Sequence, residues 1–311
     1  MVDFRYHLVS VIAIFLALAV GIVVGTTALN GTVLDNLRGS ISSLSGDKRS
    51  LEANVKDLRR TVSKDDAFAN LVGPTLVRGQ LTRQKVLVLS MPDASTGLRD
   101  ALISQVVLAG GEITGQIRLK PDLLDPTKTS AVDDLVANLG PPEGAVPGTP
   151  AQRAGAELAG ALVRRPGAPA SGATAQKVLA GFTGAELLAV ETEAVQPTAT
   201  LVLVVSGPAP VAAPDVGQRN AAALALAAAF DSRAGVVVVG PAGAADTPSV
   251  LRALRDDATL TERVSSVDDA DTPEGRITTV FALHQQVGGG AGRYGTGQGA
   301  QAAAPTPSPS R

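Results

Sequence analysis

KVLVLS, from Lys85 to Ser90, is the stretch that decides the fold. It is a short, continuous apolar run, and TLVLVVS (Thr200 to Ser206) and VVVVG (Val236 to Gly240) are of the same kind. Runs of this type, without alternating polar residues, indicate strands that are buried on both faces of a parallel sheet. EITGQIRL (Glu112 to Leu119) is expected to form a further strand.

Helical patterns separate these strands along the chain. Buried strands that alternate with helices predict an α/β domain over residues 80–287, with a mainly parallel sheet covered on both faces. VSSVDD, from Val264 to Asp269, is expected to end another strand. The predicted helices are Thr96–Leu108, Asp133–Leu139, Gln152–Arg164, Thr174–Val190 and Gln218–Phe230.

Three of the strands lead into similar loops: SMPDAS from Ser90, SGPAP from Ser206 and GPAGAAD from Gly240. Open α/β sheets bind ligands at the carboxyl ends of their strands, so these loops are one hypothesis for a small-molecule or enzymatic site. None is a P-loop or a GxGxxG motif, and ordinary turns are the alternative. GTGQG (Gly295 to Gly299) follows a helix, which is the wrong context for a dinucleotide site.

The composition excludes several kinds of chemistry. The net charge is −2 and the 27 Lys and Arg residues are scattered, so no nucleic-acid surface is expected. The chain has no Cys, two Met and two His, which leaves few soft ligands for copper(I). His284 lies in the apolar helical stretch TTVFALHQQ and is only a weak metal candidate. No catalytic residue and no cofactor site are identified, and the chain is predicted not to be an enzyme.

The N-terminal part of the chain predicts a membrane anchor. LVSVIAIFLALAVGIVVG, from Leu8 to Gly25, carries no charge and is almost long enough to span a bilayer at about 1.5 Å per residue. We expect a short cytoplasmic N-terminus (residues 1–7), a transmembrane helix (residues 8–28) and an extracytoplasmic main domain, because Arg5 and the amino terminus precede the span. A cleaved signal peptide is the alternative.

Two periodic stripes predict self-association. Within the span, small residues recur every four positions, a spacing that lets two helix backbones approach closely. Residues 33–63 then follow a heptad pattern and predict a parallel coiled coil, as a homodimer or a higher homo-oligomer. Packing of this stripe on the protein's own domain is the alternative. The small residues are Ala13, Ala17, Gly21 and Gly25, and the heptad residues are Leu37, Ile41, Leu44, Lys48, Leu51, Val55, Leu58 and Val62.

The acidic stretch DTPE, from Asp271 to Glu274, has the form of a helix start. Asp271 or Thr272 would be the N-cap, and with Asp271 as the cap Glu274 stands at the capping-box position. Ile277, Val280, Phe281 and His284 would then share the buried face of the helix. Glu274 and His284 would lie about 15 Å apart along the axis, too far to share a metal ion. The Gly-, Ala- and Pro-rich tail, residues 288–311, is predicted to be disordered.

The two ends of the chain resemble a known family. MVDFRYHLVSVIAIFLALAVGIVVG at the start, and SSVDDADTPEGRITTVFALHQQ and GRYGTGQGA near the end, resemble the mycobacterial copper transport protein B family of actinobacteria. The match is most specific in Val267 to Leu283 and in Tyr294 to Gly299. The resemblance implies an envelope protein for copper efflux and homeostasis, described as an outer-membrane pore, with copper as the transported ion. The residues alone also allow a dimeric, membrane-anchored scaffold or binding module without transport activity.

Overall fold

The structure is a computed structural model that describes residues 4–140, 148–164, 171–208 and 215–306. The chain divides into two compact units, Met1–Asp65 and Asp66–Arg311. The second unit is built on a seven-stranded sheet with the order β3-β2-β1-β4-β5-β6-β7. Strands β2 and β3 pair antiparallel, and the other neighbours pair parallel. The strands are β1 Lys85–Ser90, β2 Glu112–Leu119, β3 Leu188–Val190, β4 Leu201–Val205, β5 Gly235–Val239, β6 Ser265–Val267 and β7 Arg293–Tyr294.

The direction in which successive strands are added to the sheet changes between β1 and β4. From β1 the chain builds outward through β2 to β3, and it then returns to the other side of β1 with β4 and continues to β7. Loops that leave neighbouring strands in opposite directions open a crevice at the carboxyl ends of those strands. This topological switch point is therefore where an α/β sheet of this kind is expected to bind a ligand.

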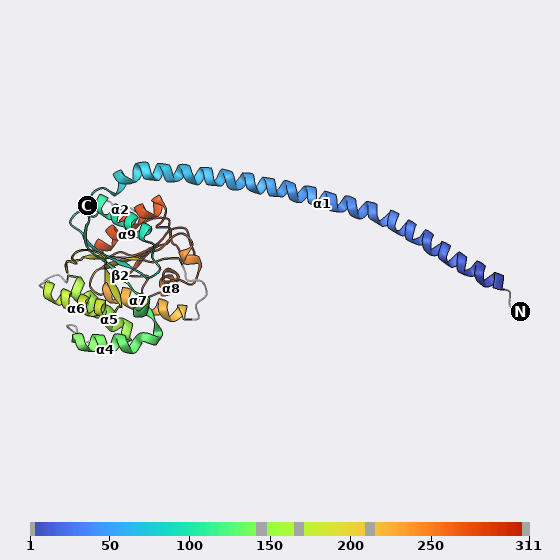
Figure 1. Ribbon diagram of the computed structural model, residues 1–311. Coiled ribbons are helices and arrows are strands. Elements are labelled where there is room, and N and C mark those ends of the chain that lie inside the picture. Colours follow the sequence, from blue (N-terminus) through green and yellow to red (C-terminus); the bar gives the residue numbers. More distant parts are fainter. Residues whose placement is uncertain (1–3, 141–147, 165–170, 209–214, 307–311) are drawn as a thin grey trace. The chain divides into compact units, whose positions relative to one another are not determined.

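Helices cover both faces of the sheet, as the strand patterns predict (Figure 1). Leu87 and Leu89 of β1 face the core beneath α4 to α7, whereas Val86 and Val88 face the core beneath α2 and α9. Both sets are buried, which explains why the strands read as continuous apolar runs. The helices are α2 Thr96–Leu108, α3 Pro121–Leu124, α4 Thr129–Leu139, α5 Pro150–Leu162, α6 Gly172–Gly184, α7 Val216–Asp231, α8 Val250–Asp256 and α9 Pro273–Val287, with short 3-10 turns η1 Pro126–Lys128 and η2 Ala244–Asp246.

Helix α1 runs from Phe4 to Val77 and belongs to both units. Its segment Arg5–Thr26 is long and apolar enough to cross a membrane by length and composition, as the sequence predicts. In the second unit Ala69 and Val77 enter the core beside α2 and α9. Gly73 packs so closely on Ile277 that a larger residue would require a shift. The second unit thus includes the last turns of α1, which lie outside the α/β domain predicted over residues 80–287.

Two predictions about secondary structure are wrong. The helix expected over Thr174–Val190 ends at Gly184, and residues 188–190 form the edge strand β3. The tail is ordered from 288 to 306: β7 pairs with β6, and Tyr294 is buried. The glycines of this segment form a tight loop around the buried carboxylate of Asp268 and do not form a flexible linker. Residues 307–311 of the predicted disordered tail and residues 1–3 of the predicted cytoplasmic N-terminus lie outside the described residues.

Candidate functional site

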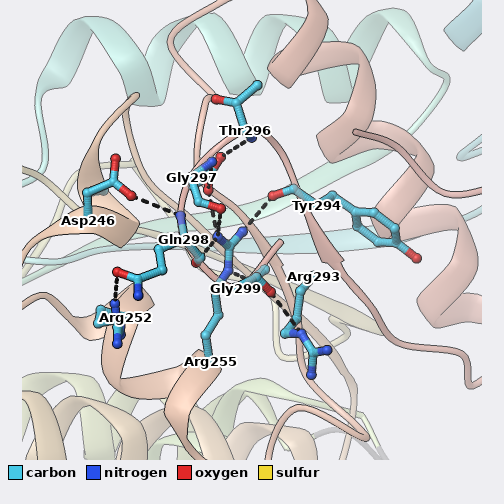
Figure 2. A network of polar contacts seen from close by, with 12 residues as sticks. Asp246, Arg252, Arg255, Arg293, Tyr294, Thr296, Gly297, Gln298 and Gly299 are labelled. Atoms are coloured by element: carbon cyan, nitrogen blue, oxygen red, sulfur yellow. Dashed lines mark hydrogen bonds and ion pairs between the residues drawn. The ribbon is translucent and has the colours of Figure 1, made fainter. Parts of the chain in front are cut away.

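A buried ion pair between Arg255 and Asp268 contacts both segments that carry the family resemblance. Arg255 of α8 and Asp268, directly after β6, are 1% and 0% exposed, and Nη1 of Arg255 lies 2.6 Å from Oδ2 of Asp268. The guanidinium also donates to Oγ of Ser266 at 3.1 Å and to the carbonyls of Tyr294 at 2.6 Å and Gln298 at 2.8 Å (Figure 2). The charge of Arg255 is therefore surrounded by acceptors, as a buried cation requires.

Asp268 is held by the loop that follows β7. The backbone N–H of Thr296 donates to Oδ1 at 2.8 Å, and that of Gly297 donates to Oδ2 at 2.7 Å. A Cβ on Gly295 or on Gly297 would overlap the Asp268 carboxylate, and Gly295 has a φ of +114°. Glycine at both positions is what allows the backbone to approach the carboxylate. The GTGQG loop thus binds an anion, and this anion is the protein's own Asp268 carboxylate. The loop is not a dinucleotide site.

Further contacts fasten this loop to its surroundings. The backbone N–H of Gln298 donates to Oδ1 of Asp246 at 2.9 Å, and its side chain accepts from Arg252 (Figure 2). Arg293 donates from Nε to the carbonyl of Gly299 at 3.0 Å. The loop therefore connects η2, α8 and β6, which makes it part of the fold at this edge of the sheet.

The neighbouring carboxyl, Asp269, has the opposite surroundings. It is 8% exposed, and its Oδ1 is buried with no hydrogen-bond partner. Burial raises the pKa of Asp269 to about 6, and the negative charges of Asp268, Asp271 and Glu274 add to the increase. A Cβ on Gly275 would overlap the carbonyl oxygen of Asp269, so α9 begins in close contact with this residue. Asp269 is a buried acid without a counter-ion among the described residues.

The helix start at 271–274 is confirmed in outline and corrected in detail. Thr272, one of the two expected candidates, is the N-cap of α9 and accepts from the N–H of Gly275, with Pro273 in the first turn. Asp271 is not the cap, because its carboxylate accepts instead from the N–H of Ala242 at 2.8 Å. With Thr272 as the cap, Gly275 stands three residues on, so Glu274 does not complete a capping box. Glu274 remains an acid in the first turn, where the helix dipole favours it.

His284 does not lie on the buried face of α9, which is a correction to the expected pattern. It is exposed, and its Nδ1 lies 2.7 Å from the carbonyl oxygen of Gln80. Ile277 and Val280 are buried as expected, whereas Phe281 is half-buried. In the described part of the chain, no group of three or more His, Cys, Asp and Glu residues could hold a metal ion.

The two predicted association stripes lie on α1, and the described part of the chain leaves most of their residues uncovered. Ala13, Ala17 and Gly21 are exposed, as are the heptad residues, with Leu44 at 70% and Leu58 at 66%. Lys48 makes an ion pair with Glu52 at 3.6 Å on its own helix. Association through these stripes stays a prediction, because the structure contains one chain.

A cavity of about 200 Å³ lies at the switch point between β1 and β4. Two of the three predicted strand-end loops line it: SMPDAS contributes Met91, Pro92 and Asp93, and SGPAP, which is described up to residue 208, contributes Ser206 and Gly207. The GPAGAAD loop does not contribute; Asp271 binds it at Ala242. The remaining lining residues are Pro121, Leu124, Val216, Arg219, Asn220, Ser249 and Val250.

The sequence did not indicate the Arg255–Asp268 pair, nor the contribution of Arg219 and Asn220 to the cavity. Arg255 lies in a short helix without a motif, and nothing in its neighbours distinguishes it from a surface arginine. A signal was present in the loop, since two glycines that flank a threonine are typical of a backbone that binds an anion closely. The partner anion comes from another strand and becomes evident only in the folded chain.

Comparison with known proteins gives matches over almost the whole chain. The model of the family described as "Copper transport outer membrane protein, MctB" matches residues 1–305. A protein of Mycobacterium tuberculosis named "Copper transporter MctB" is 31% identical over 309 residues, which cover 96% of this chain and 98% of that protein. The protein of the same name from Mycobacterium leprae is 30% identical over 313 residues, with the same coverage.

Proposed function

The chain belongs to the MctB family of copper transport outer membrane proteins, and on that premise we propose that it takes part in copper transport at the cell envelope. The single observation that carries the proposal is the match over residues 1–305, which includes the apolar helix, the α/β unit and the loop around Asp268. The relatives are named as transporters and not as enzymes. These names support a role related to transport.

The membrane segment is the part we assign to the transport step. The described residues contain one candidate span, and a single helix per chain can line a path for an ion only when several chains associate. The small residues Ala13, Ala17, Gly21 and Gly25 would be the helix-packing surface in such an assembly. The heptads from Leu37 to Val62 would hold the chains in parallel outside the span.

The α/β unit would support this assembly and would not store the ion. Its described residues offer no cluster of metal ligands, and the carboxylates around Asp269 are hard ligands that do not select copper(I). We therefore propose that copper is cargo of the assembled chains and not a resident cofactor. The N-terminus would be cytoplasmic and the α/β unit extracytoplasmic, on the charge pattern around the span.

Copper content measured in cells that lack the gene tests the proposal. We expect the deleted strain to accumulate copper and to lose copper tolerance, and the intact gene to restore both. Leu44→Asp, on the heptad stripe, should restore them poorly, whereas Ser42→Asp, two residues away and off the stripe, should restore them fully. Unchanged copper content in the deletion strain would refute a role in copper transport.

A second candidate is a dimeric, membrane-anchored scaffold without transport activity. Two observations favour it: the heptad stripe on α1 is exposed, and the described residues contain no cluster of metal ligands. Copper flux through the purified full chain in liposomes separates the two candidates. Flux above that of empty liposomes supports transport, and its absence together with a copper phenotype in cells supports the scaffold.

A further inference from the structure

Hydrogen bonds of the backbone hold the two loops that line the cavity at the switch point. The N–H of Met91 donates to the carbonyl of Val205 at 2.8 Å, and that of Ala94 donates to the carbonyl of Met91 at 3.0 Å. Ser206 donates from both N and Oγ to the carbonyl of Val239. A Cβ on Gly207 would overlap the carbonyl oxygen of Asp93, so a glycine is needed where the two loops meet. The space is therefore maintained by hydrogen bonds on two of its sides.

One polar side chain in the cavity wall is buried and has no partner. Asn220 of α7 is 8% exposed, and among the described residues its amide makes no hydrogen bond. The amide lies in the cavity wall, where it can form hydrogen bonds with a bound molecule or with water. The amide oxygen can accept and the amide nitrogen can donate, so Asn220 can fix the orientation of a bound molecule.

The charge around the cavity is negative. Arg219 is the one cation in the described lining, and it is already neutralised by Asp215, with Nε 2.5 Å from Oδ2, and by Asp125, with Nη2 3.3 Å from Oδ2. Asp93 is an exposed residue of the lining, and it has no ion-pair partner among the described residues. Partial burial of its carboxyl raises the pKa above the usual value, and hydrogen bonds from the backbone N–H groups of Asp93 and Gly207 offset part of that increase.

The rest of the wall is mainly apolar, and the hydroxyls of Ser206 and Ser249 are already used in hydrogen bonds to the carbonyls of Val239 and Ala244. The apolar lining residues are Met91, Pro92, Pro121, Leu124, Val216 and Val250. A cavity of about 200 Å³ excludes a dinucleotide and admits a molecule with a body of only a few carbon atoms. The carboxylate of Asp93, which lines the cavity, would repel a bound anion and would pair with a bound cation.

We propose that this cavity binds a small organic ammonium compound with a compact apolar body. Asp93 would pair with the ammonium group, Asn220 would accept or donate one hydrogen bond, and the body would lie against Met91 and Leu124. The site lies at the carboxyl ends of β1 and β4, which is where sheets of this topology bind their ligands. The inference is independent of copper transport, because no copper ligand takes part in it.

Isothermal titration of the full chain in detergent micelles tests the site with three probes of one shape: 3-methylbutylammonium, 3-methylbutanol and 3-methylbutanoate. We expect the ammonium compound to bind at least about tenfold more tightly than the alcohol, because the alcohol cannot form a charged hydrogen bond with Asp93. The carboxylate should not bind, because Asp93 carries the same charge. Heat measured with empty micelles is subtracted, so that partition of the probes into detergent does not count as binding.

Two variants locate the binding. Asp93→Asn keeps the shape of the side chain and should lower the affinity for the ammonium compound about tenfold or more. The affinity for the alcohol should change by no more than about twofold. Asp134→Asn, an exposed acid of α4 outside the cavity, should change neither. Equal binding of ammonium and alcohol, an unchanged affinity in Asp93→Asn, or no binding of the ammonium compound at millimolar concentration would each overturn the proposal.

Discussion

Asp268 and Asp269 are adjacent aspartates, and we predict that replacing each by Asn has opposite effects on stability. Asp268→Asn removes the charge that faces Arg255 and leaves a buried cation without its carboxylate. Loss of one partner from a buried ion pair costs about 3–5 kcal/mol. Asp269→Asn removes a buried charge that has no counter-ion among the described residues. A rise in a carboxyl pKa from 3.8 to about 6 corresponds to about 3 kcal/mol. The free energy of unfolding of Asp269→Asn should therefore increase by up to that amount at pH 7.

The pH dependence has a defined sign. Because the folded-state pKa of Asp269 lies above its unfolded value of 3.8, its protonation favours the folded state. The contribution is complete below pH 3.8 and is lost as the pH rises through about 6. This residue should therefore make the natural chain about 1.3 kcal/mol more stable at pH 5 than at pH 7, and Asp269→Asn should lack that increment.

Pulse proteolysis of the full chain in detergent, across a urea series at pH 5 and pH 7, measures these changes without a tryptophan probe. The surviving fragment of the α/β unit reports the folded fraction at each urea concentration. We expect the midpoint to fall for Asp268→Asn, and to rise for Asp269→Asn with a larger rise at pH 7 than at pH 5. Equal losses of stability in both variants would refute the contrast drawn between the two carboxyls.

Further predictions concern the loop, the stalk and the histidine. Gly297→Ala should cost about 1–3 kcal/mol in the same assay, because its Cβ overlaps the Asp268 carboxylate, whereas Gly184→Ala, with open space around it, should cost nothing. Leu44→Cys should crosslink into dimers in membranes and Ser42→Cys should not; monomers from both would exclude the coiled coil. His284→Gln should leave cellular copper unchanged, and copper accumulation as in the deletion strain would assign the exposed imidazole a role in transport.

The sequence predicts the parts of the fold that depend on local pattern. The boundaries of β1 and β2 are as expected, and the apolar span is found on α1, because both signals lie within a few neighbouring residues. The edge strands β3 and β7 are not predicted as strands, since two or three residues with a partly polar composition carry little periodicity. Their structure depends on pairing with a strand that is already in place.

The site residues show the same division. Thr272 could be found because a helix cap depends on residues three positions apart. The pairing of Arg255 with Asp268, and of both with the loop from Tyr294, joins residues that only the sheet order brings together. Composition was misleading for the tail, because glycine is as necessary to a loop that encloses a carboxylate as to a flexible linker.

The position of the anion-binding loop in the chain has a consequence for synthesis. Asp268 leaves the ribosome 28 residues before Thr296 and 29 before Gly297, the residues whose N–H groups bind it. At about 5–20 residues per second, β1 to β6 are available for some seconds before that loop follows. During this interval the aspartate has no backbone donors from the loop, and Arg255 lacks the carbonyls of Tyr294 and Gln298. The edge of the sheet is thus completed late in synthesis. A chain stopped before residue 294 would leave Arg255 and Asp268 accessible to quality-control proteases.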